Sequence, residues 1–274
     1  MENERLRKYA ANVRQNILTE IHAAQSGHPG GSLSAADIVT TLYFDEMGIN
    51  EENVNTINRD RFVLSKGHAS PLLYAVLCEK GFISKEELLT FRRINSRLQG
   101  HPNMNYLPGV DMSTGSLGQG VSTAVGMAMA NKLDKNEHRI YTLLGDGECQ
   151  EGQVWEAAMA AGHYQLDNLC LIVDHNRLQI DGDVKKVMNV DPLDEKFKAF
   201  GFHVLTINGH DFDEIKAAFK EARETKGMPT AIIAMTTKGQ GVSFMENQAG
   251  WHGVAPNDAQ FEQAIKELGG NDHE

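Results

Sequence analysis

The sequence contains few cysteines and no long apolar segment, and each absence excludes a class of protein. Its three cysteines, Cys78, Cys149 and Cys170, are widely spaced and form no CxxC pair. This pattern indicates reduced thiols in a cytoplasmic protein rather than a disulfide framework or a zinc site. No apolar run approaches the roughly 20 residues that a membrane-spanning helix needs. The charged N-terminus, "MENERLRKYA", lacks the apolar core of a signal peptide.

Clusters of basic residues are also absent, and the formal net charge is −11. Nucleic acid and anionic membranes are therefore poor candidate partners. A phosphorylated ligand would need a local anion site or a metal ion. The chain of 274 residues is 41% hydrophobic and 23% charged, as in soluble globular proteins. We predict one domain over residues 1–274, without a separate N-terminal domain.

Helical spacing and glycine-rich breaks dominate the first 130 residues. The apolar spacing predicts a helix over residues 5–24. Capping boxes are expected at Ser34 with Asp37 and at Ser84 with Glu87. From about residue 139 the pattern changes to apolar strands alternating with helices. The strands are expected at 139–144, 168–173, 202–207 and 230–237, with a helix over 152–164 and another capped by Asp211. Such alternation predicts an α/β fold with a mostly parallel sheet flanked by helices.

The segment "LLGDGECQEGQVWEAAMAAGHYQLDNLCLIVDHN" contains one strand–helix–strand unit, with polar residues after each strand. Asp146 and Asn176 then lie at the carboxyl ends of parallel strands, where α/β sheets bind ligands. Gly147 lets a phosphate approach its backbone N–H, at the start of a helix that favours anions. One carboxylate and one amide oxygen suit Mg²⁺ if a diphosphate supplies further oxygens. A lone Gly-Asp-Gly is a common turn former. The interpretation as a cation–diphosphate site therefore depends largely on Asn176 at the end of the next strand.

Five histidines directly follow a glycine: His28, His68, His101, His163 and His210. His163 lies at the end of a predicted helix and His210 precedes a helix cap, so both are set aside. The other three lie in loops rich in Gly, Pro and Ser, where function concentrates. Imidazoles can donate hydrogen bonds to phosphate oxygens and pass protons near neutral pH.

These segments together resemble transketolase. The similarity includes "GDGECQEGQVWEA" with "NLCLIVDHN", and also "SGHPGGSLS", "LSKGHASP", "GHPN" and "TGSLGQG" in the family's order. The resemblance covers nearly the whole chain and implies thiamine diphosphate with Mg²⁺, or Ca²⁺ in its place. It also implies the metal ligands Asp146, Asn176 and the Leu178 carbonyl.

The resemblance further implies the roles of individual residues. His68 contacts the cofactor diphosphate, His28 and His101 line the substrate channel, and His252 contacts cofactor and substrate. The family often has two histidines near "GWHGVAP", where this chain has one, so the register of His252 is open. The cofactor-binding residues implied are His68, Gly115, Ser116, Leu117, Gly147, Glu156, Asn176, Ile180 and His252. The loop 115–117 would run beneath the cofactor rings and Ile180 would pack near the thiazolium. Without the resemblance, Leu178 and Ile180 would be interpreted as apolar side chains packed in the protein interior.

Glu151 and Glu156 follow the Gly-Asp-Gly segment on the predicted helix. Without the resemblance they would be interpreted as solvated helix charges. The family places the first of them, Glu151, between two cofactor sites at a subunit interface, as a protonatable catalytic carboxylate.

In transketolases a pyrimidine-binding domain supplies the glutamate that activates the cofactor, and a C-terminal domain follows it. Neither is present before the chain ends at Glu274. We therefore expect the N-terminal subunit of a split transketolase, paired with a separate C-terminal subunit in a dimer of heterodimers. The expected reaction transfers a two-carbon ketol unit between sugar phosphates of the pentose phosphate pathway.

Three alternatives stay open at this point. A 1-deoxyxylulose-phosphate synthase or a 2-oxoacid dehydrogenase component would share the cofactor, but the segment around His101 and the order of the loops argue against both. A split ketol-transferase for another sugar phosphate fits equally well. A non-catalytic cofactor-binding subunit is a third interpretation, which the intact Asp146, Asn176 and loop histidines disfavour.

Overall fold

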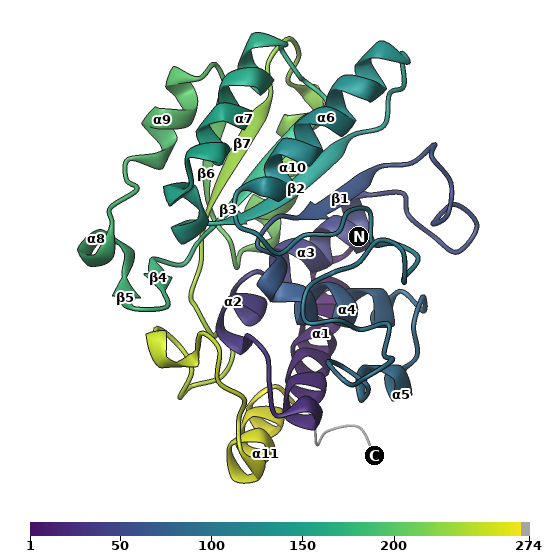
Figure 1. The fold of residues 1–274 in the computed structure, drawn as a ribbon, viewed down its shortest axis with the longest axis vertical. Helices are drawn as coiled ribbons and strands as arrows, with labels where there is room; N and C mark the ends of the chain where they lie inside the picture. The colour runs from purple at the N-terminus through teal and green to yellow at the C-terminus, as the bar shows by residue number, and fades with distance from the viewer. Residues whose placement is uncertain (270–274) are drawn as a thin grey trace.

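A computed structural model describes residues 1–269 and shows a parallel five-stranded sheet between two helical layers (Figure 1). The strands of this sheet are β1 (Arg61–Leu64), β2 (Ile140–Gly145), β3 (Leu169–His175), β6 (His203–Asn208) and β7 (Thr230–Met235). Their spatial order is β1-β2-β3-β7-β6. A small antiparallel hairpin, β4 (Leu178–Gln179) with β5 (Gly182–Asp183), follows β3. The predicted fold class is confirmed.

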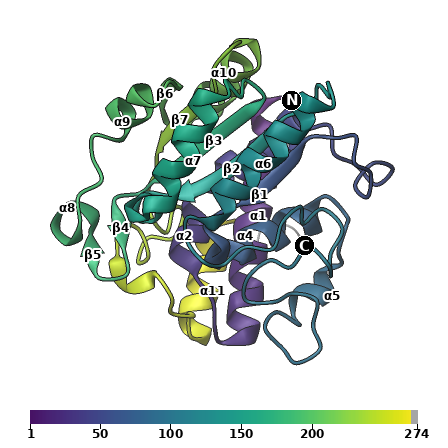
Figure 2. The same cartoon turned by 45° about the horizontal axis from the view of Figure 1, so that its top comes forward.

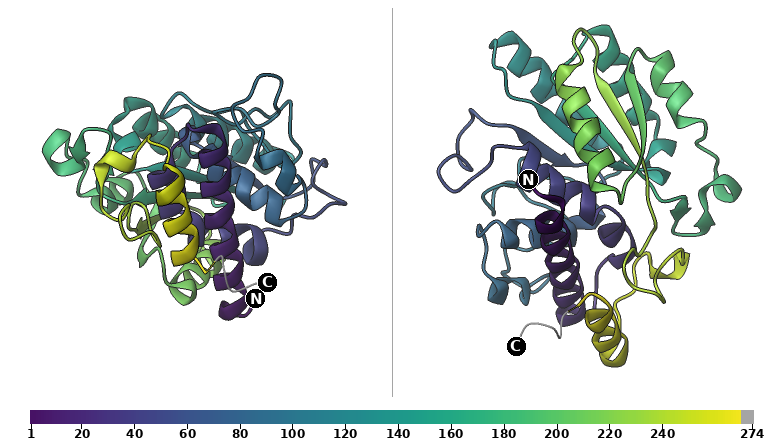
Figure 3. Two further views of the ribbon diagram at one scale, coloured as in Figure 1. Left: turned by 90° about the horizontal axis from the view of Figure 1, so that it is seen from below. Right: turned by 180° about the vertical axis from the view of Figure 1, so that it is seen from behind.

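Helices cover both faces of the sheet, and further helices lie beyond its carboxyl edge (Figures 1 and 3). They are α1 (Asn3–Ala24), α2 (Pro29–Ser34), α3 (Ala36–Thr41), α4 (Ser70–Glu79), α5 (Lys85–Leu88), α6 (Gln119–Leu133), α7 (Gly152–His163), α8 (Val184–Val187), α9 (Leu193–Ala199), α10 (Phe212–Glu224) and α11 (Asp258–Glu267). Helices α6, α7 and α9 cover one face, while α3 and α10 lie on the other, and α1 and α4 pack against α3 and extend that core. Alternate strand residues supply the two cores: Leu144 and Val173 pack toward α6 and α7, and Leu143 and Ile172 toward the opposite layer.

The local predictions were mostly correct. Each of the four predicted strands is present, within two residues of its predicted ends, and Asp211 caps α10 by accepting from the backbone N–H groups of Asp213 and Glu214. Ser84 likewise caps α5. The strand β1 was missed, because four residues inside a helix-rich region carry too little pattern. The capping box at Ser34 was wrong: Ser34 ends α2, and Ala35 is the residue that precedes α3.

The carboxyl ends of four adjacent strands meet at one edge of the sheet, which faces α2 (Figure 2). The residues just beyond these ends are Lys66 after β1, Asp146 after β2, Asn176 after β3 and Lys238 after β7. Because β1 pairs with β2, the N-terminal part of the chain contributes directly to this edge. Among residues 1–269, no helix has the length and apolar character needed to cross a bilayer.

Candidate functional site

A cavity of about 340 Å³ opens at this carboxyl edge. Eleven of the site residues predicted from the sequence line it: His28, His68, Gly115, Leu117, Asp146, Gly147, Glu151, Asn176, Leu178, Ile180 and His252. They come from segments that are far apart in the chain. The structure therefore brings most of the predicted site together in one place.

Three of the predicted histidines form a compact cluster in this cavity. The ring centroids of His28 and His68 are 5.2 Å apart, those of His28 and His252 are 5.4 Å apart, and those of His68 and His252 are 5.3 Å apart. His28 comes from the residue before α2, His68 from the turn after β1, and His252 from the segment before α11. His252 lines the cavity beside His28 and His68, and this position supports its inclusion in the site.

The environment keeps these imidazoles neutral. Burial, with Arg92, His101 and Lys238 nearby, lowers the pKa of His28 to about 4. Burial and the Lys238 ammonium lower the pKa of His252 to about 3. Burial and Lys66 hold the pKa of His68 well below its usual range. A neutral imidazole can donate from one nitrogen and accept at the other, as proton transfer to and from hydroxyl groups requires.

The remaining predicted residues lie outside the cavity lining. His101 is exposed, and its ring lies against Gly115, where a Cβ would approach the ring within 3.2 Å. Ser116 is exposed in the same loop. Glu156 is exposed on α7, whereas Glu151 lines the cavity from the position that precedes α7.

Asp146 and Asn176 follow adjacent strands, as the strand–helix–strand unit predicts, because Gly145 pairs with Asp174 in the sheet. Asp146 is 2% exposed. One of its carboxylate oxygens accepts from the backbone N–H of Gly147 at 2.7 Å, and the other accepts from that of Arg177 at 2.5 Å. These bonds fix the carboxylate in the wall of the cavity.

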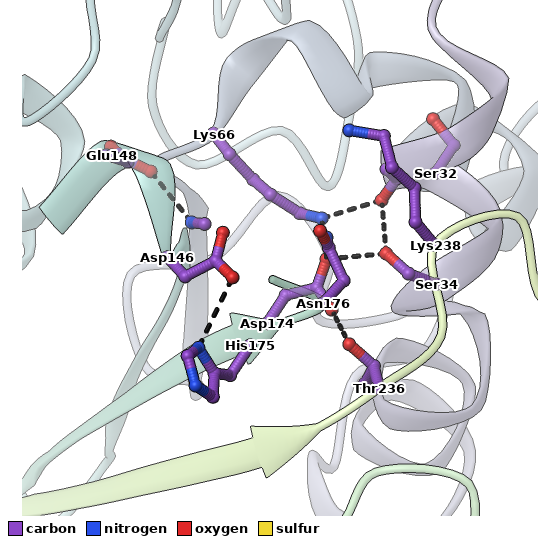
Figure 4. A network of polar contacts seen from close by, with 12 residues as sticks. Ser32, Ser34, Lys66, Asp146, Glu148, Asp174, His175, Asn176, Thr236 and Lys238 are labelled. Carbon is purple, nitrogen blue, oxygen red and sulfur yellow. Dashed lines mark hydrogen bonds and ion pairs between the residues drawn. The ribbon is translucent and has the colours of Figure 1, made fainter. Parts of the chain in front are cut away.

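A hydrogen bond to Asp174 orients the Asn176 side chain (Figure 4). The Asn176 amide donates to Asp174 Oδ2 at 3.0 Å, and its oxygen accepts from the Leu178 N–H at 3.1 Å. Asp174 is fully buried and also accepts from Lys66 Nζ at 2.6 Å. Two hydroxyl groups complete this network: Ser34 and Thr236 both donate to Asp174.

Charge compensation keeps Asp174 ionised. Burial alone would raise the pKa of its carboxyl, but the Lys66 ammonium and the hydrogen bonds from Lys66, Ser34 and Thr236 together hold the pKa below its ordinary value. The Lys66 ammonium also donates to the Gly31 carbonyl at 2.6 Å. The buried ion pair is thus hydrogen-bonded on both sides, as a buried charge requires.

Lys238 is the second cation at this edge, and it is 1% exposed. Its ammonium lies 2.9 Å from His252 Nδ1 and donates to the Leu178 carbonyl at 3.1 Å. Burial and the nearby Lys66 lower the pKa of Lys238 to about 8, against the opposing effect of Asp174 and Asp146. The Leu178 carbonyl, predicted as a metal ligand, is therefore engaged by this ammonium.

Sequence reasoning missed Lys66, Asp174, Lys238 and Glu148, all of which line or support the cavity. A usable signal was present for Asp174 and the lysines: each is a charged residue directly at the end of a buried apolar strand or within three residues of it. Such a charge is rarely buried without a partner. Glu148 had no comparable signal, because it resembles the neighbouring Glu151.

The donor set fits a diphosphate held with a divalent cation. The two buried ammonium groups, those of Lys66 and Lys238, can face an anion. Asp146, Asn176 and Leu178 offer hard oxygens. Within residues 1–269, no three or more His, Cys, Asp or Glu side chains cluster closely enough to hold a metal alone. A cation here would therefore depend on oxygens that the ligand brings.

Fold and site together define an α/β protein that binds a diphosphate-bearing cofactor at the carboxyl edge of a parallel sheet. Residues 6–274 match the family described as transketolase, thiamine diphosphate binding domain. The chain belongs to the transketolase family and corresponds to this cofactor-binding part, which confirms the resemblance found in the sequence.

The chain is similar both to relatives of about its own length and to much longer transketolases. It is 43% identical over 268 residues to an apulose-4-phosphate transketolase subunit from Phocaeicola vulgatus, covering 98% of this chain and 95% of that protein. It is 45% identical over 262 residues to the 6-deoxy-6-sulfo-D-fructose transketolase subunit SqwG of a Clostridium species, covering 95% of each. Human transketolase is 43% identical over 264 residues, which make up 96% of this chain and 42% of the human protein.

Among solved structures, transketolase from Campylobacter jejuni superposes with a TM-score of 0.92 at 40% identity. That match covers 98% of this chain and 43% of the Campylobacter chain. The chain thus spans less than half of these full-length transketolases. It nearly matches the length of the two relatives that are named as subunits.

Proposed function

We propose that this chain binds Mg²⁺–thiamine diphosphate by its diphosphate end and acts as the N-terminal subunit of a split transketolase. The observation that carries this proposal is the convergence of four strand ends on one cavity, with Asp146, Asn176, Lys238 and the histidine cluster around it. Asp146, Asn176 and the Leu178 carbonyl would hold the cation, in which role Ca²⁺ could replace Mg²⁺. When bound, thiamine diphosphate supplies the electron sink for breaking and forming a carbon–carbon bond.

The chain's own residues would position the cofactor and move protons. His68, Gly147 and Lys238 would donate to the diphosphate. Gly115, Ser116 and Leu117 would lie beneath the cofactor rings, with Ile180 near the thiazolium. His28, His101 and His252 would exchange protons with sugar hydroxyl groups in the channel.

A separate subunit would complete the site. Ile180 is 69% exposed and Glu151 and Glu156 are exposed, as expected for residues that a second subunit covers. Two relatives of nearly this length are named as subunits, which supports a separate C-terminal partner. We propose a dimer of heterodimers with Glu151 toward the second pair, and Glu156 as a cofactor-binding residue. The three cysteines are free and buried, in keeping with a cytoplasmic location.

The sugar is the open part of the proposal. Transfer between pentose phosphates is the first candidate. The names of two relatives specify apulose-4-phosphate and 6-deoxy-6-sulfo-D-fructose, which favours a split ketol-transferase for another sugar as the second candidate. In the complex, this chain and the partner would share the contacts to the sugar.

A ketol-transfer assay tests this function. The chain is assayed alone and with a candidate pyrimidine-domain subunit, with thiamine diphosphate, Mg²⁺ and ribose 5-phosphate as acceptor. Xylulose 5-phosphate and the sugars of the two relatives serve as donors in parallel. Activity only in the mixture is expected, and the preferred donor decides between the two candidates. Activity of the chain alone would contradict the need for a second subunit, while binding without transfer from any donor would indicate a non-catalytic subunit.

A further inference from the structure

Glu148 is a buried carboxylate in the short turn Gly147–Gln150 that follows β2, and it is 2% exposed. Its Oε1 accepts from Ser65 Oγ at 2.5 Å and from the Gly118 backbone N–H at 2.9 Å. Its Oε2 accepts from the Gly145 backbone N–H at 3.1 Å. Glu148 and Asp146 lie side by side at the carboxyl edge (Figure 4).

The three donors to Glu148 belong to three segments that each contribute residues to the cavity lining. Ser65 begins the loop after β1 that carries Lys66 and His68. Gly118 ends the loop that carries Gly115 and Leu117. Gly145 begins the turn that carries Asp146 and Gly147. The Glu148 side chain thus connects three segments that line the cavity.

These loops pack backbone against backbone, so little room exists for other side chains between them. A Cβ on Gly120 would lie 2.7 Å from Ser65 Cα, and one on Gly67 would lie 2.7 Å from the Gly115 backbone nitrogen. These close approaches leave the N–H and O–H donors of the loops in need of hydrogen-bond acceptors. The Glu148 carboxylate satisfies a donor on each loop.

A carboxylate that is 2% exposed is costly to bury without hydrogen bonds. Ser65, Gly118 and Gly145 supply these hydrogen bonds to Glu148. A polar group that is costly to bury persists when its bonds determine a local geometry. Here that geometry is the relative position of three ligand-facing loops.

We propose that Glu148 is a positioning residue that holds these three loops in the arrangement that binds thiamine diphosphate. It acts through Ser65, Gly118 and Gly145, without itself contacting the cofactor. The inference rests on the proposed function, because it names a residue that supports the same site. Pre-organised loops bind a ligand more tightly, since less ordering remains to be done on binding.

The test compares Glu148→Gln with the parent chain, each combined with its partner subunit. Glutamine keeps the size of the side chain. Its NH₂ group replaces one carboxylate oxygen and would face the donors that this oxygen accepts from. Binding of thiamine diphosphate with Mg²⁺ is measured by calorimetry, and thermal unfolding is measured without ligand. Glu46→Gln is the matched control. The Glu46 side chain is 4% exposed, pairs with Arg223 and accepts from Tyr141 Oη at 2.6 Å near the amino end of β2.

We expect both variants to lower the melting temperature and only Glu148→Gln to raise the Kd for the cofactor, by about tenfold or more. Ser65→Ala, a milder change, should also weaken binding. In the double variant the two effects should add to less than their sum, because both variants disrupt the Ser65–Glu148 hydrogen bond. Unchanged affinity in Glu148→Gln and Ser65→Ala would overturn the proposal. Absence of cofactor binding by the parent complex would instead overturn the proposed function.

Discussion

The two edges of the sheet both carry basic side chains beside a cavity, yet only one has the chemistry of a site. The cavity at the amino edge has a volume of about 520 Å³ and is lined by Lys132, Lys135, Asn136, Glu137, Arg139, Asp167, Asn168, Arg223 and Lys226. The cavity at the carboxyl edge is smaller, at about 340 Å³. Size and positive charge alone would favour the amino edge.

The difference lies in what the basic groups contact. At the amino edge, Lys132 donates to the carbonyls of Tyr164 and Gln165, and Arg139 donates to those of Asp167 and Ala222. These carbonyls lie at or just beyond the ends of α7 and α10, where helices leave acceptors unpaired. The cations there stabilise the fold.

At the carboxyl edge the cations are buried among ligand-facing groups. Lys238 is 1% exposed, and burial together with the nearby Lys66 lowers its pKa to about 8. A bound diphosphate would place negative charge beside this ammonium. A site is thus recognised by what its polar groups contact rather than by the size of a cavity.

The largest expected effect comes from Asp146→Ala. Loss of the carboxylate should weaken binding of thiamine diphosphate in the presence of Mg²⁺ by about 100-fold or more, since a charged ligand to the cation is removed. Calorimetric titration of the complex measures this. Asp167→Ala at the amino edge is the matched control and should leave the affinity unchanged. Equal losses of cofactor affinity in Asp146→Ala and Asp167→Ala would contradict the assignment of the cofactor site to the carboxyl edge.

Lys238→Met should weaken cofactor binding by roughly tenfold to 100-fold, because a charge-assisted hydrogen bond contributes about 1.5–3 kcal/mol. The parent's affinity should also decline above about pH 8, where free Lys238 loses its proton. Lys132→Met is the comparison at the amino edge. An unchanged Kd in Lys238→Met would exclude Lys238 from the anion site.

The stability of the free chain should decrease on acidification. The pKa of His28 is lowered from 6.5 to about 4 in the folded chain, so the unfolded chain binds more protons between these values. The free energy of unfolding should therefore fall as the pH drops from 6.5 toward 4, and His252 extends the effect to lower pH. Urea unfolding at several pH values measures this. His28→Gln should flatten the slope, and an equal slope in this variant would contradict the account.

The smallest effect is expected at the amino edge. Lys132→Ala should lower the free energy of unfolding by about 0.5 kcal/mol, as for a cation near the end of a helix. Thermal unfolding measures this change. A clear change in cofactor affinity for this variant would indicate that the two edges are coupled.

Much of the fold was predictable from the sequence because its signals are local and strong. Continuous apolar runs gave β2, β3, β6 and β7, and Asp211 marked the start of α10. The four residues of β1 carry no comparable pattern. Ser34 was misassigned because its serine–aspartate spacing matches a capping box, whereas tertiary structure directs its hydroxyl to Asp174.

The site was predictable where a motif combines with strand position, as for Asp146 and Asn176. Glu148 and Glu151 show the limit of this reasoning. They are three positions apart in one polar segment, but Glu148 is buried with three donors and Glu151 is exposed. Their difference arises from loops contributed by distant parts of the chain, which no local pattern encodes. Lys66 and Lys238 differ from Glu148, because each follows a strand within three residues and that position was a usable signal.

Nuclear magnetic resonance of the isotope-labelled chain, combined with its unlabelled partner, shows which edge of the sheet binds the cofactor. Amide resonances are followed while thiamine diphosphate and Mg²⁺ are added. We predict that the largest shifts fall on Gly147, Asn176 and Lys238 at the carboxyl edge, with Lys132 and Arg139 unaffected. Shifts centred on Lys132 and Arg139 would contradict the assignment and place the anion site at the opposite edge of the sheet.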